Sequence, residues 1–298
     1  MPEGHSVHRL ARQFTSVFGG ERLRVSSPQG RFADGAARLE GATMLTALAH
    51  GKQMFLRFDN DLVLRVHLGL YGAWSFGGDS TFRGASSIGA PRRVGESERS
   101  EPVGDAGPGG STEYIGPPEP VGAVRVRLVS EHGWADLRGP TACEVITAAE
   151  EQAVRARLGP DPLQPGADGT HFERRITSSV TPVGVQLMNQ AVIAGIGNIY
   201  RAELLFLQGV SPWRPGRQLR QDEAAGLWSD AVRLMSDGVR EGRIITTTPE
   251  ARGGRPRRSA PHYVYKRTGE PCRRCGTPIR SSEMSARTVF WCPQCQPD

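Results

Sequence analysis

Four cysteines near the end of the chain have the spacing of a metal site. They form the pattern Cys272-x2-Cys275-x16-Cys292-x2-Cys295. Two CxxC pairs separated by a hairpin-length gap are typical of a tetrahedral zinc–thiolate centre, and a short segment with little core takes its folding free energy from the metal. Because four thiolates leave no open coordination position, the pattern predicts one structural Zn2+ and argues against a catalytic one.

The alternative for the same cysteines is a pair of disulfides in a secreted domain. That arrangement leaves the fifth cysteine, Cys143, without a partner, and the first residues, Met1 to His5, do not have the pattern of a signal peptide. No apolar run approaches the roughly 18 residues that a membrane helix needs. We therefore expect a cytoplasmic protein with a zinc finger.

The net charge of +6 is unevenly placed along the chain. Residues 250–298 contain 10 Arg or Lys and 4 Asp or Glu, whereas the rest of the chain contains 27 of each. The basic side chains fall in two groups, Arg252, Arg255, Arg257 and Arg258, then Lys266, Arg267, Arg273 and Arg274. Such a run forms either a solvated tail or a phosphate-facing surface. Beside a zinc finger and the aromatic residues Tyr263 and Tyr265, it favours nucleic acid.

Hydrophobic periodicity divides the chain into a strand-rich and a helical part. Residues 4–18 have helical spacing and end at Gly19-Gly20. Strand patterns follow at 44–48, 53–58, 62–68, 73–76, 124–129 and 134–137. Helical patterns follow at 146–157, 183–192, 199–208 and 221–241. Several short strands after one helix indicate a β-sandwich or barrel-like domain, followed by a helical one.

The strand-rich part is interrupted by residues 77–120, of which 10 are Gly, 6 Pro and 6 Ser. This composition buries too little apolar surface to offset its ordering entropy, so we predict a disordered insertion in a loop of the β-domain. The predicted domains are then 1–140, 141–250 and a zinc finger over 262–298.

The turn Gly195-Ile196-Gly197-Asn198 joins two apolar helices. Glycines let the backbone come close to a ligand, and a helix N-terminus presents free N–H groups to a phosphate. Asn198 would cap that helix and donate to the same phosphate. An ordinary helical hairpin uses the same glycines, so the turn alone leaves both interpretations open.

Several motifs taken together resemble the formamidopyrimidine-DNA glycosylase/endonuclease VIII family. They are Met1-Pro2-Glu3-Gly4 before a helix, the Gly-Ile-Gly-Asn-Ile-Tyr turn and the four-cysteine finger, with further similar segments at 51–52, 67–72, 158–163, 264–272 and 287–296. The resemblance covers nearly all of the chain outside the insertion. It implies an α+β fold: an N-terminal β-sandwich domain with an N-terminal helix, a helical helix–two-turn–helix domain and a C-terminal zinc ribbon.

The resemblance implies that Pro2, Glu3 and Lys52 are catalytic. Removal of Met1 exposes the secondary amine of Pro2, which as an α-amine titrates near pH 8, about two units below lysine. That amine would attack the sugar C1′, Glu3 would transfer protons, and Lys52 would contact the phosphate at the lesion. The alternatives are that Pro and Glu are simply favoured at helix starts and that Lys52 is solvated.

The resemblance also implies a set of DNA-binding residues. Leu70 and Tyr71 would fill the space left by a flipped nucleotide, and Arg287, between the CxxC pairs at the tip of a hairpin, would bind a phosphate beside the lesion. Asn198 would bind DNA from the glycine turn. His67 is either a phosphate contact or a core histidine, and Leu70 and Tyr71 are otherwise residues of the sheet core.

The function implied is a bifunctional DNA glycosylase/AP lyase that excises oxidised bases, pyrimidines favoured, and cleaves the strand by β- and δ-elimination. Its expected partner is double-stranded DNA with oxidised bases or abasic sites, bound by a monomer associated with the nucleoid. Three alternatives remain: a non-catalytic binder of damaged DNA, a glycosylase that prefers 8-oxoguanine and formamidopyrimidines, and an AP lyase with little glycosylase activity.

Overall fold

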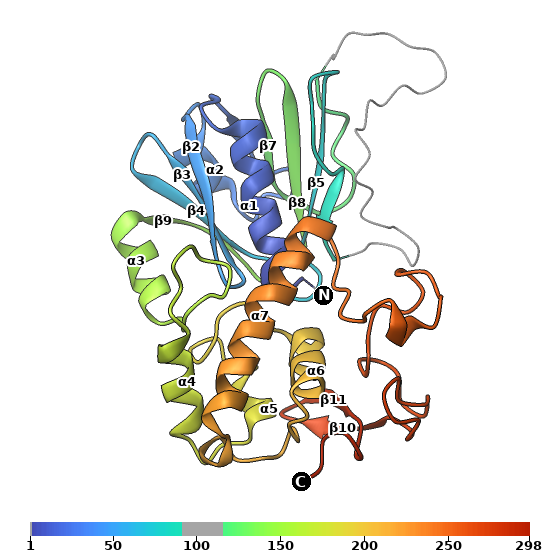
Figure 1. The fold of residues 1–298 in the computed structure, drawn as a ribbon. Helices are drawn as coiled ribbons and strands as arrows, with labels where there is room; N and C mark the ends of the chain where they lie inside the picture. Colours follow the sequence, from blue (N-terminus) through green and yellow to red (C-terminus); the bar gives the residue numbers. More distant parts are fainter. Residues whose placement is uncertain (1, 91–115) are drawn as a thin grey trace. The chain divides into compact units, whose positions relative to one another are not determined.

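The computed structural model describes residues 2–90 and 116–298 (Figure 1). Met1, whose removal the sequence interpretation requires, lies outside the described residues, as do residues 91–115. No helix in the two described stretches is long and apolar enough to cross a membrane.

The described chain forms two compact units. Unit 1 contains Pro2 and the segment Ser6–Ala156, and unit 2 contains Glu3–His5 and Arg157–Asp298. The first helix, α1 (Gly4–Phe18), therefore begins in unit 2 and continues in unit 1.

Unit 1 contains two antiparallel sheets. The first has the order β1 (Arg24–Ser26), β7 (Val124–Val129), β8 (Gly133–Arg138), β5 (Ala73–Gly78) and β6 (Ser87–Gly89). The second has the order β2 (Met44–His50), β3 (Gln53–Phe58), β4 (Leu62–His67) and β9 (Ala142–Thr147). Two short helices, α2 (Ala33–Leu39) and α3 (Ala148–Ala156), complete the unit. The predicted β-sandwich with an N-terminal helix is confirmed.

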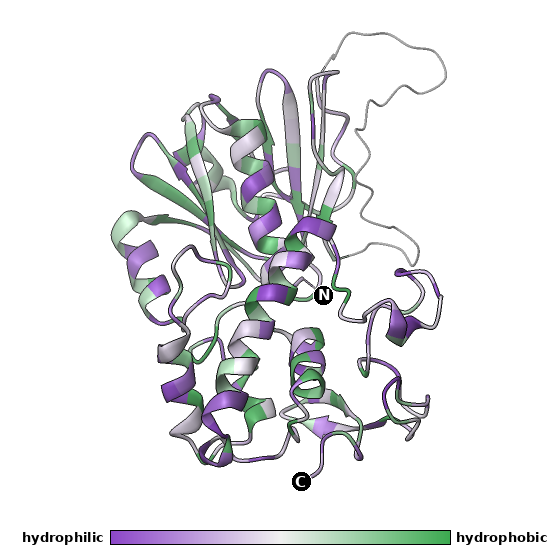
Figure 2. Ribbon diagram, in the orientation of Figure 1, coloured by the Kyte–Doolittle hydropathy of each residue, from purple (hydrophilic) through white to green (hydrophobic). Residues whose placement is uncertain are grey.

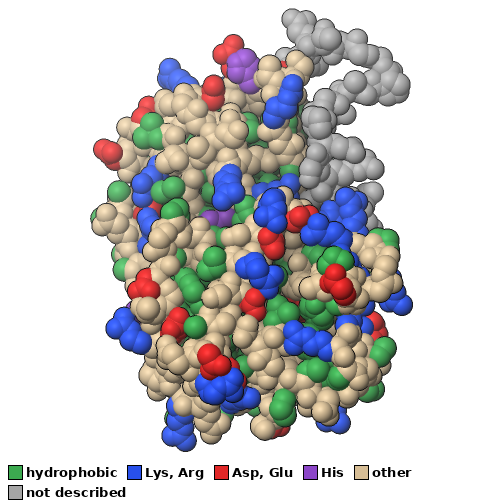
Figure 3. Space-filling model, viewed as in Figure 1, with side chains coloured by type: hydrophobic (Ala, Val, Ile, Leu, Met, Phe, Trp, Pro, Cys, Tyr) green, Lys and Arg blue, Asp and Glu red, His purple; other side chains and the backbone are tan. Residues whose placement is uncertain are grey.

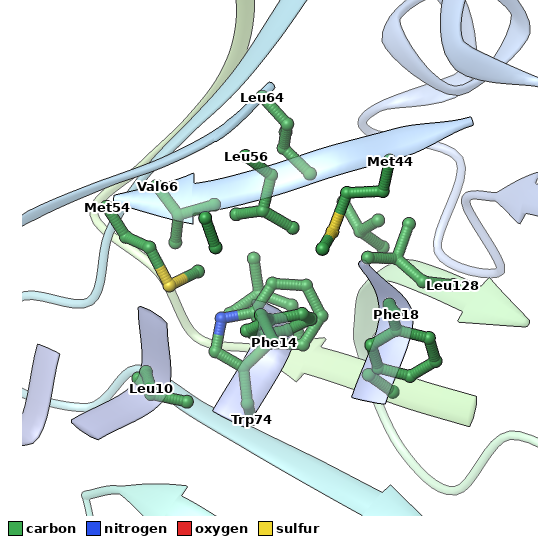
Figure 4. Close-up of a cluster of buried hydrophobic side chains, with 14 of the residues drawn as sticks. Leu10, Phe14, Phe18, Met44, Met54, Leu56, Leu64, Val66, Trp74 and Leu128 are labelled. Atoms are coloured by element: carbon green, nitrogen blue, oxygen red, sulfur yellow. The ribbon is translucent and has the colours of Figure 1, made fainter. Parts of the chain in front are cut away.

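The core of unit 1 lies between these sheets and the apolar face of α1 (Figure 4). Leu10, Phe14 and Phe18 are fully buried on that face, as the helical spacing of the sequence predicts. The ring of Phe14 meets Trp74 of β5 edge-on, with the ring centroids 4.7 Å apart. Edge-to-face pairs of this kind add to the free energy gained by burial, so α1 is held firmly from its second turn onward.

The predicted disordered insertion is wrong at its beginning. Residues 77–90 are part of unit 1: β5 runs to Gly78, and β6 pairs with it. Phe82, Ala85 and Ile88 are buried in the core. The Gly, Pro and Ser content was averaged over 44 residues, and this average concealed three apolar side chains at spacings that reach the core.

The end of unit 1 also differs from the sequence prediction. The division between the units falls at Ala156, whereas the predicted domain boundary falls at residue 140. Residues 142–147 form β9, which pairs along the whole of β4, and only then does α3 begin. Hydrophobic periodicity does not separate so short a strand from the helix that directly follows it.

Unit 2 is built from helices and the zinc ribbon. Its helices are α4 (Gly169–Thr177), α5 (Val183–Gln186), α6 (Asn198–Leu207) and α7 (Gln221–Glu241), with two 3-10 turns, η1 (Gly216–Gln218) and η2 (Glu250–Arg252). Figure 2 shows hydrophilic and hydrophobic residues alternating along α7, as expected of a helix with one buried face. The helix predicted over 183–192 is only α5, after which the chain runs in turns to α6, and α4 was not predicted.

The zinc ribbon contains the hairpin of β10 (Arg280–Met284) and β11 (Arg287–Trp291). Its two-residue turn, Ser285-Ala286, has φ values of 51° and 57°. Positive φ at both positions is the type I′ geometry that matches the twist of a hairpin. Arg287 is therefore the first residue after the turn, at the tip where the sequence places it.

Candidate functional site

The carboxylate of Glu3 caps the N-terminus of α6. Glu3 is fully buried. Its Oε2 accepts from the backbone N–H of Gly197 at 2.9 Å, and its Oε1 accepts from that of Ile199 at 2.9 Å. The first N–H groups of a helix lack partners within it and carry partial positive charge, so a buried anion is stabilised there. The sequence pattern predicts that these N–H groups bind a phosphate, but in the structure they bind the carboxylate of Glu3.

The glycines of the turn before α6 admit the first residues of the chain. A Cβ on Gly197 would lie 2.4 Å from Cδ of Glu3, and a Cβ on Gly4 would lie 2.8 Å from Cα of Gly195. The N–H of Gly4 donates to the carbonyl of Gly195 at 2.9 Å. The close approach predicted from these glycines is therefore real, but what approaches is Glu3 and Gly4 of the same chain.

Asn198 does not cap α6, because Gly197 occupies the cap position without a side-chain bond. The Asn198 amide nitrogen donates to the carbonyl of Thr288 at 2.9 Å, and its oxygen accepts from Arg201. These bonds connect α6 to β11 next to Arg287, whose side chain is exposed. The structure thus brings Asn198 and Arg287, two of the predicted DNA-binding residues, to one place in unit 2.

Arg201 lies in the same cluster and was not predicted. It is fully buried, and among the described residues neither Nε nor Nη1 has a hydrogen-bond partner. Burial and then the positive charge of Arg287 lower its pKa to about 10, while Glu3 acts in the opposite direction. A buried guanidinium with unsatisfied donors beside a second arginine is a site for an anion. The signal in the sequence is an arginine inside the apolar run of α6.

A second buried charge, Glu203, was also missed. Its carboxylate accepts from the backbone N–H groups of Tyr263, Val264 and Tyr265, at 2.8, 2.9 and 2.9 Å, and from the hydroxyl of Thr246. One side chain of α6 thereby fixes the segment that leads into the zinc ribbon.

Lys52 and His67 lie at one end of the second sheet of unit 1. Lys52 is in the turn between β2 and β3, and His67 ends β4. Burial, and then the positive charges of Lys52 and Arg65, hold the pKa of His67 below its usual range. His67 is therefore half-buried, neutral over a wider pH range than a free histidine, and close enough to Lys52 for their charges to interact.

Leu70 and Tyr71 are not residues of the sheet core, so that alternative is wrong. They lie in the turn between β4 and β5 and are 47% and 80% exposed. The N–H of Gly72 donates to the carbonyl of Leu68 at 2.9 Å and closes the turn. The turn therefore holds two large apolar side chains in solvent, which is a costly arrangement for a surface without a partner.

The basic run at 252–274 does not form one phosphate-facing surface. Arg252 and Arg267 are buried and donate to backbone carbonyls, and Arg274 donates to the end of α6 and stacks on Phe206. Figure 3 shows basic side chains interspersed with carboxylates on the visible face. Much of the charge that the sequence assigned to nucleic acid thus holds unit 2 together.

The four ribbon cysteines fit a single zinc ion. Their sulfurs all lie within 4.8 Å of one another, with 3.9 Å between Cys272 and Cys295 and 3.5 Å between Cys275 and Cys292. Zn–S bonds of about 2.3 Å in a tetrahedron require sulfurs about 3.8 Å apart. Cys143 lies in β9 of unit 1, far along the chain, and burial raises its pKa to about 12. The predicted structural zinc site is confirmed.

Gln296, just after the last cysteine, connects the metal site to the helices and was not predicted. It is buried, accepts from the N–H of Cys292 at 3.0 Å and donates to the carbonyl of Val210 at 2.9 Å. Such contacts around a metal ligand fix its orientation.

Models of three protein domain families match the chain, one after another along the sequence. The formamidopyrimidine-DNA glycosylase N-terminal domain matches residues 1–105, and the formamidopyrimidine-DNA glycosylase H2TH domain matches residues 158–250. The zinc finger found in FPG and IleRS matches residues 269–297.

Relatives match over the full length. The chain is 43% identical over 308 residues to "Endonuclease 8 1" of Mycobacterium tuberculosis, covering 99% of this chain and 100% of that protein. It is 30% identical to the formamidopyrimidine-DNA glycosylase of Bordetella petrii, covering 99% of each. Among solved structures, the fold is similar to that of Lactococcus lactis Fpg in complex with abasic-site DNA, with a TM-score of 0.72 at 20% identity over 99% of this chain and 100% of that one.

The zinc site generates a prediction about DNA binding. Cys292→Ser should reduce the zinc content from one ion per chain to well below one. If Arg287 contacts DNA as the sequence predicts, the change should also weaken DNA binding by about 1.5–3 kcal/mol, because the hairpin that carries Arg287 loses its support. Metal analysis and fluorescence anisotropy measure the two effects. Cys143→Ser is the matched control and should keep both. Full DNA affinity in a zinc-free Cys292→Ser protein would contradict the prediction.

The lowered pKa of His67 generates a prediction about stability and pH. As the pH falls below about 6.5, the unfolded chain takes up a proton at His67 while the folded chain stays neutral there. The free energy of unfolding therefore falls as the pH falls, and the contribution of His67 to stability is complete only above about pH 6.5. Urea unfolding at pH 7.5 and pH 5.5 should therefore show a smaller loss for His67→Asn than for the parent protein. Burial lowers the pKa of His262 in unit 2 as well, so His262→Asn should reduce the loss separately. An unchanged loss in His67→Asn would contradict the assignment.

Proposed function

We propose that this chain, which belongs to the formamidopyrimidine-DNA glycosylase/endonuclease VIII family, is a DNA glycosylase that also cleaves the strand at the abasic site it creates. It removes damaged bases from double-stranded DNA in base excision repair.

The observation that carries the proposal is the anchoring of the N-terminus. The first residues of a chain are usually poorly ordered unless something ties them down. Here Glu3 is held by two backbone N–H groups of α6, and Gly4 is bonded to Gly195. A chain that fixes its third and fourth residues this firmly is suited to using the amine of the adjacent Pro2 as a positioned nucleophile.

The chemistry starts with that amine. After Met1 is removed, the neutral Pro2 nitrogen attacks the sugar C1′, the bond from C1′ to the base breaks, and the base leaves with the electron pair and gains a proton. Loss of the nitrogen proton and opening of the sugar ring give an iminium ion. The iminium accepts the electron pair released when a C2′ proton is lost, which gives an enamine. The enamine then expels the 3′ phosphate, which leaves with the electron pair of its bond to C3′. A second elimination releases the 5′ phosphate, so that phosphates remain at both ends of a one-nucleotide gap.

Glu3 is the residue placed to move protons in these steps. It follows Pro2 directly, and its carboxylate has a fixed orientation at the start of α6. The same N–H groups stabilise its negative charge, so a proton that it takes up is readily passed on. We propose that it protonates the opening sugar ring and then takes protons during the eliminations.

The cluster of Asn198, Arg201 and Arg287 is the proposed phosphate grip. Arg201 has two buried donor nitrogens that lack partners among the described residues, and exposed Arg287 lies close enough to affect its pKa. A phosphate bound there would satisfy these donors in a position set by α6 and the hairpin tip. The zinc takes no part in bond breaking, because four thiolates would fill its coordination sphere.

Unit 1 would supply the remaining contacts. Lys52 and His67 would lie along the strand that carries the lesion. Leu70 and Tyr71, exposed in their turn, are suited to fill the gap left by a flipped nucleotide. Such a protein would work where chromosomal DNA is, and we place it in the cytoplasm with the nucleoid.

The preferred lesion is proposed to be an oxidised pyrimidine. Support comes from Gly4, from the Leu70-Tyr71 pair, and from the 43% identity to a relative named as an endonuclease 8, against 30% to one named as a formamidopyrimidine-DNA glycosylase.

Borohydride trapping tests the nucleophile. The mature protein, incubated with abasic-site DNA and borohydride, should form a covalent adduct whose cross-linked peptide begins at Pro2, and Pro2→Gly should reduce its yield at least about tenfold because a primary amine replaces the preorganised secondary one. Pro28→Gly, at an exposed turn of unit 1, is the matched control and should trap fully. Absence of an adduct, full trapping by Pro2→Gly, or a mass showing that Met1 is retained would make the protein a binder of damaged DNA instead.

Excision of two lesions tests the preference. Duplexes that contain thymine glycol or 8-oxoguanine should be cleaved at rates that favour thymine glycol by about tenfold, roughly 1.4 kcal/mol of differential transition-state binding. Denaturing gels read both products. Faster cleavage at 8-oxoguanine would reverse the assignment, and strand cleavage only at preformed abasic sites would make the protein an AP lyase.

A further inference from the structure

Lysine is almost absent from this basic chain. Of its 37 Lys and Arg residues only two are lysines, Lys52 and Lys266. Arg and Lys differ in chemistry: guanidinium is a flat fork that stacks and forms paired bonds, whereas ammonium is a compact, strongly hydrated point charge. Lys52 is at a proposed catalytic position, and Lys266 has had no role so far.

Lys266 has a strained backbone. Its φ is 56°, in the left-handed region that non-glycine residues rarely adopt. The other described non-glycine residues with positive φ, Asp61, Ser285 and Ala286, lie in hairpin turns, where this geometry closes the loop. Lys266 is the third residue of a β-turn, which the N–H of Arg267 closes by donating to the carbonyl of Val264 at 3.1 Å. Turns with positive φ at this position favour glycine, so keeping a lysine there has a cost that the turn does not require.

The chain on both sides forces this conformation. The N–H groups of the three preceding residues donate to the buried carboxylate of Glu203. On the other side, the buried Arg267 donates to the carbonyls of Tyr263 and Pro271, at 2.5 and 2.9 Å. Strain of this kind persists only where the surroundings determine it, and it is concentrated at functional sites.

The position of Lys266 in unit 2 connects it to the proposed phosphate grip. Its side chain is exposed, with Nζ 5.8 Å from the ring centre of Tyr265. That ring is 5.3 Å from the ring of Phe290 in β11, the strand that carries Arg287 and the carbonyl to which Asn198 and Arg201 donate. The negative charge of Glu3 adds to burial in raising the pKa of Tyr265. Lys266 is therefore next to the ring of Tyr265, which is close enough to the proposed catalytic carboxylate of Glu3 for the two to interact electrostatically.

We propose that Lys266 binds a backbone phosphate of the damaged strand, next to the phosphate held by Arg201 and Arg287. This rests on the proposed function in that the ligand is DNA. The bonds to Glu203 and from Arg267 fix the backbone on both sides of Lys266, so little backbone freedom has to be lost when the phosphate arrives. The contact is sequence-independent, as a phosphate contact must be.

Salt dependence of binding is the measurement that reports such a contact. Each phosphate contact adds about 0.9 to the slope of log affinity against log salt for duplex DNA. Lys266→Gln should lower the slope by about one and weaken binding about fivefold near 0.15 M salt, equally for duplexes of different sequence. The ligand is a duplex with an uncleavable abasic-site analogue, so that turnover does not interfere. Lys266→Arg keeps the positive charge and should therefore keep the slope of the parent protein.

A glycine substitution separates binding from folding. Lys266→Gly removes the charge and also relieves the positive φ, so it should raise the thermal midpoint of the protein while lowering the slope as Lys266→Gln does. Weaker binding by a more stable variant does not come from misfolding. Arg233→Gln, at an exposed position of α7, removes the same unit of charge and should leave the slope unchanged.

Two results would overturn the proposal. One is an unchanged slope in both Lys266→Gln and Lys266→Gly, and the other is an equal fall in Arg233→Gln, which would indicate a general effect of net charge. Borohydride trapping of the same variants keeps the two proposals distinguishable. A parent protein that shows the slope difference but forms no adduct would retain Lys266 as a phosphate contact while the catalytic proposal fails.

Discussion

The bond between the Glu3 carboxylate and the start of α6 is the constraint on which the rest of the proposed site depends. It joins the beginning of the chain to a helix almost two hundred residues later, through the N–H groups of Gly197 and Ile199. One interaction completes a helix end that would otherwise have unsatisfied donors, and it orients the only side chain between Pro2 and α1. Stability and the proposed chemistry are therefore not separable at this residue, and a loss of activity on changing it has meaning only beside a measure of folding.

Helix α6 carries three polar side chains into an otherwise apolar environment, and each connects it to a different segment. Asn198 reaches β11, Arg201 is directed to the same strand with donors to spare, and Glu203 fixes the backbone of 263–265. Buried charges are tolerated only when they are compensated. Glu203 is compensated inside the protein, whereas two donors of Arg201 have no partner among the described residues. That difference separates the structural role of Glu203 from the phosphate-binding role proposed for Arg201, although the two lie one turn apart or less.

Features that depend on residues close together in the sequence could be predicted, whereas contacts between residues far apart in the sequence could not. The α1 helix, six of the strands and the ribbon were predicted because periodicity and cysteine spacing are local patterns. The occupant of the glycine turn was not, because Glu3 is remote in sequence and nothing local distinguishes an internal carboxylate from a bound phosphate. The arginines at 252, 267 and 274 were assigned to nucleic acid for the same reason: charge is visible in a sequence, but the carbonyls that absorb it are not. The burial of residues 82, 85 and 88 was missed because the segment was judged by its average composition.

The scarcity of lysine gives the protein an unusual chemical signature. Once Met1 is gone, the amines of the chain are those of Pro2, Lys52 and Lys266, against 35 guanidinium groups of much lower nucleophilicity. All three are at positions assigned here to DNA. An amine-acylating reagent under mild conditions is thereby directed mainly to the surface proposed to bind DNA, and the pattern of its attachment would be a footprint of the bound strand. By the same reasoning, aldehydes that condense with amines would modify this protein mainly at the positions proposed to contact DNA.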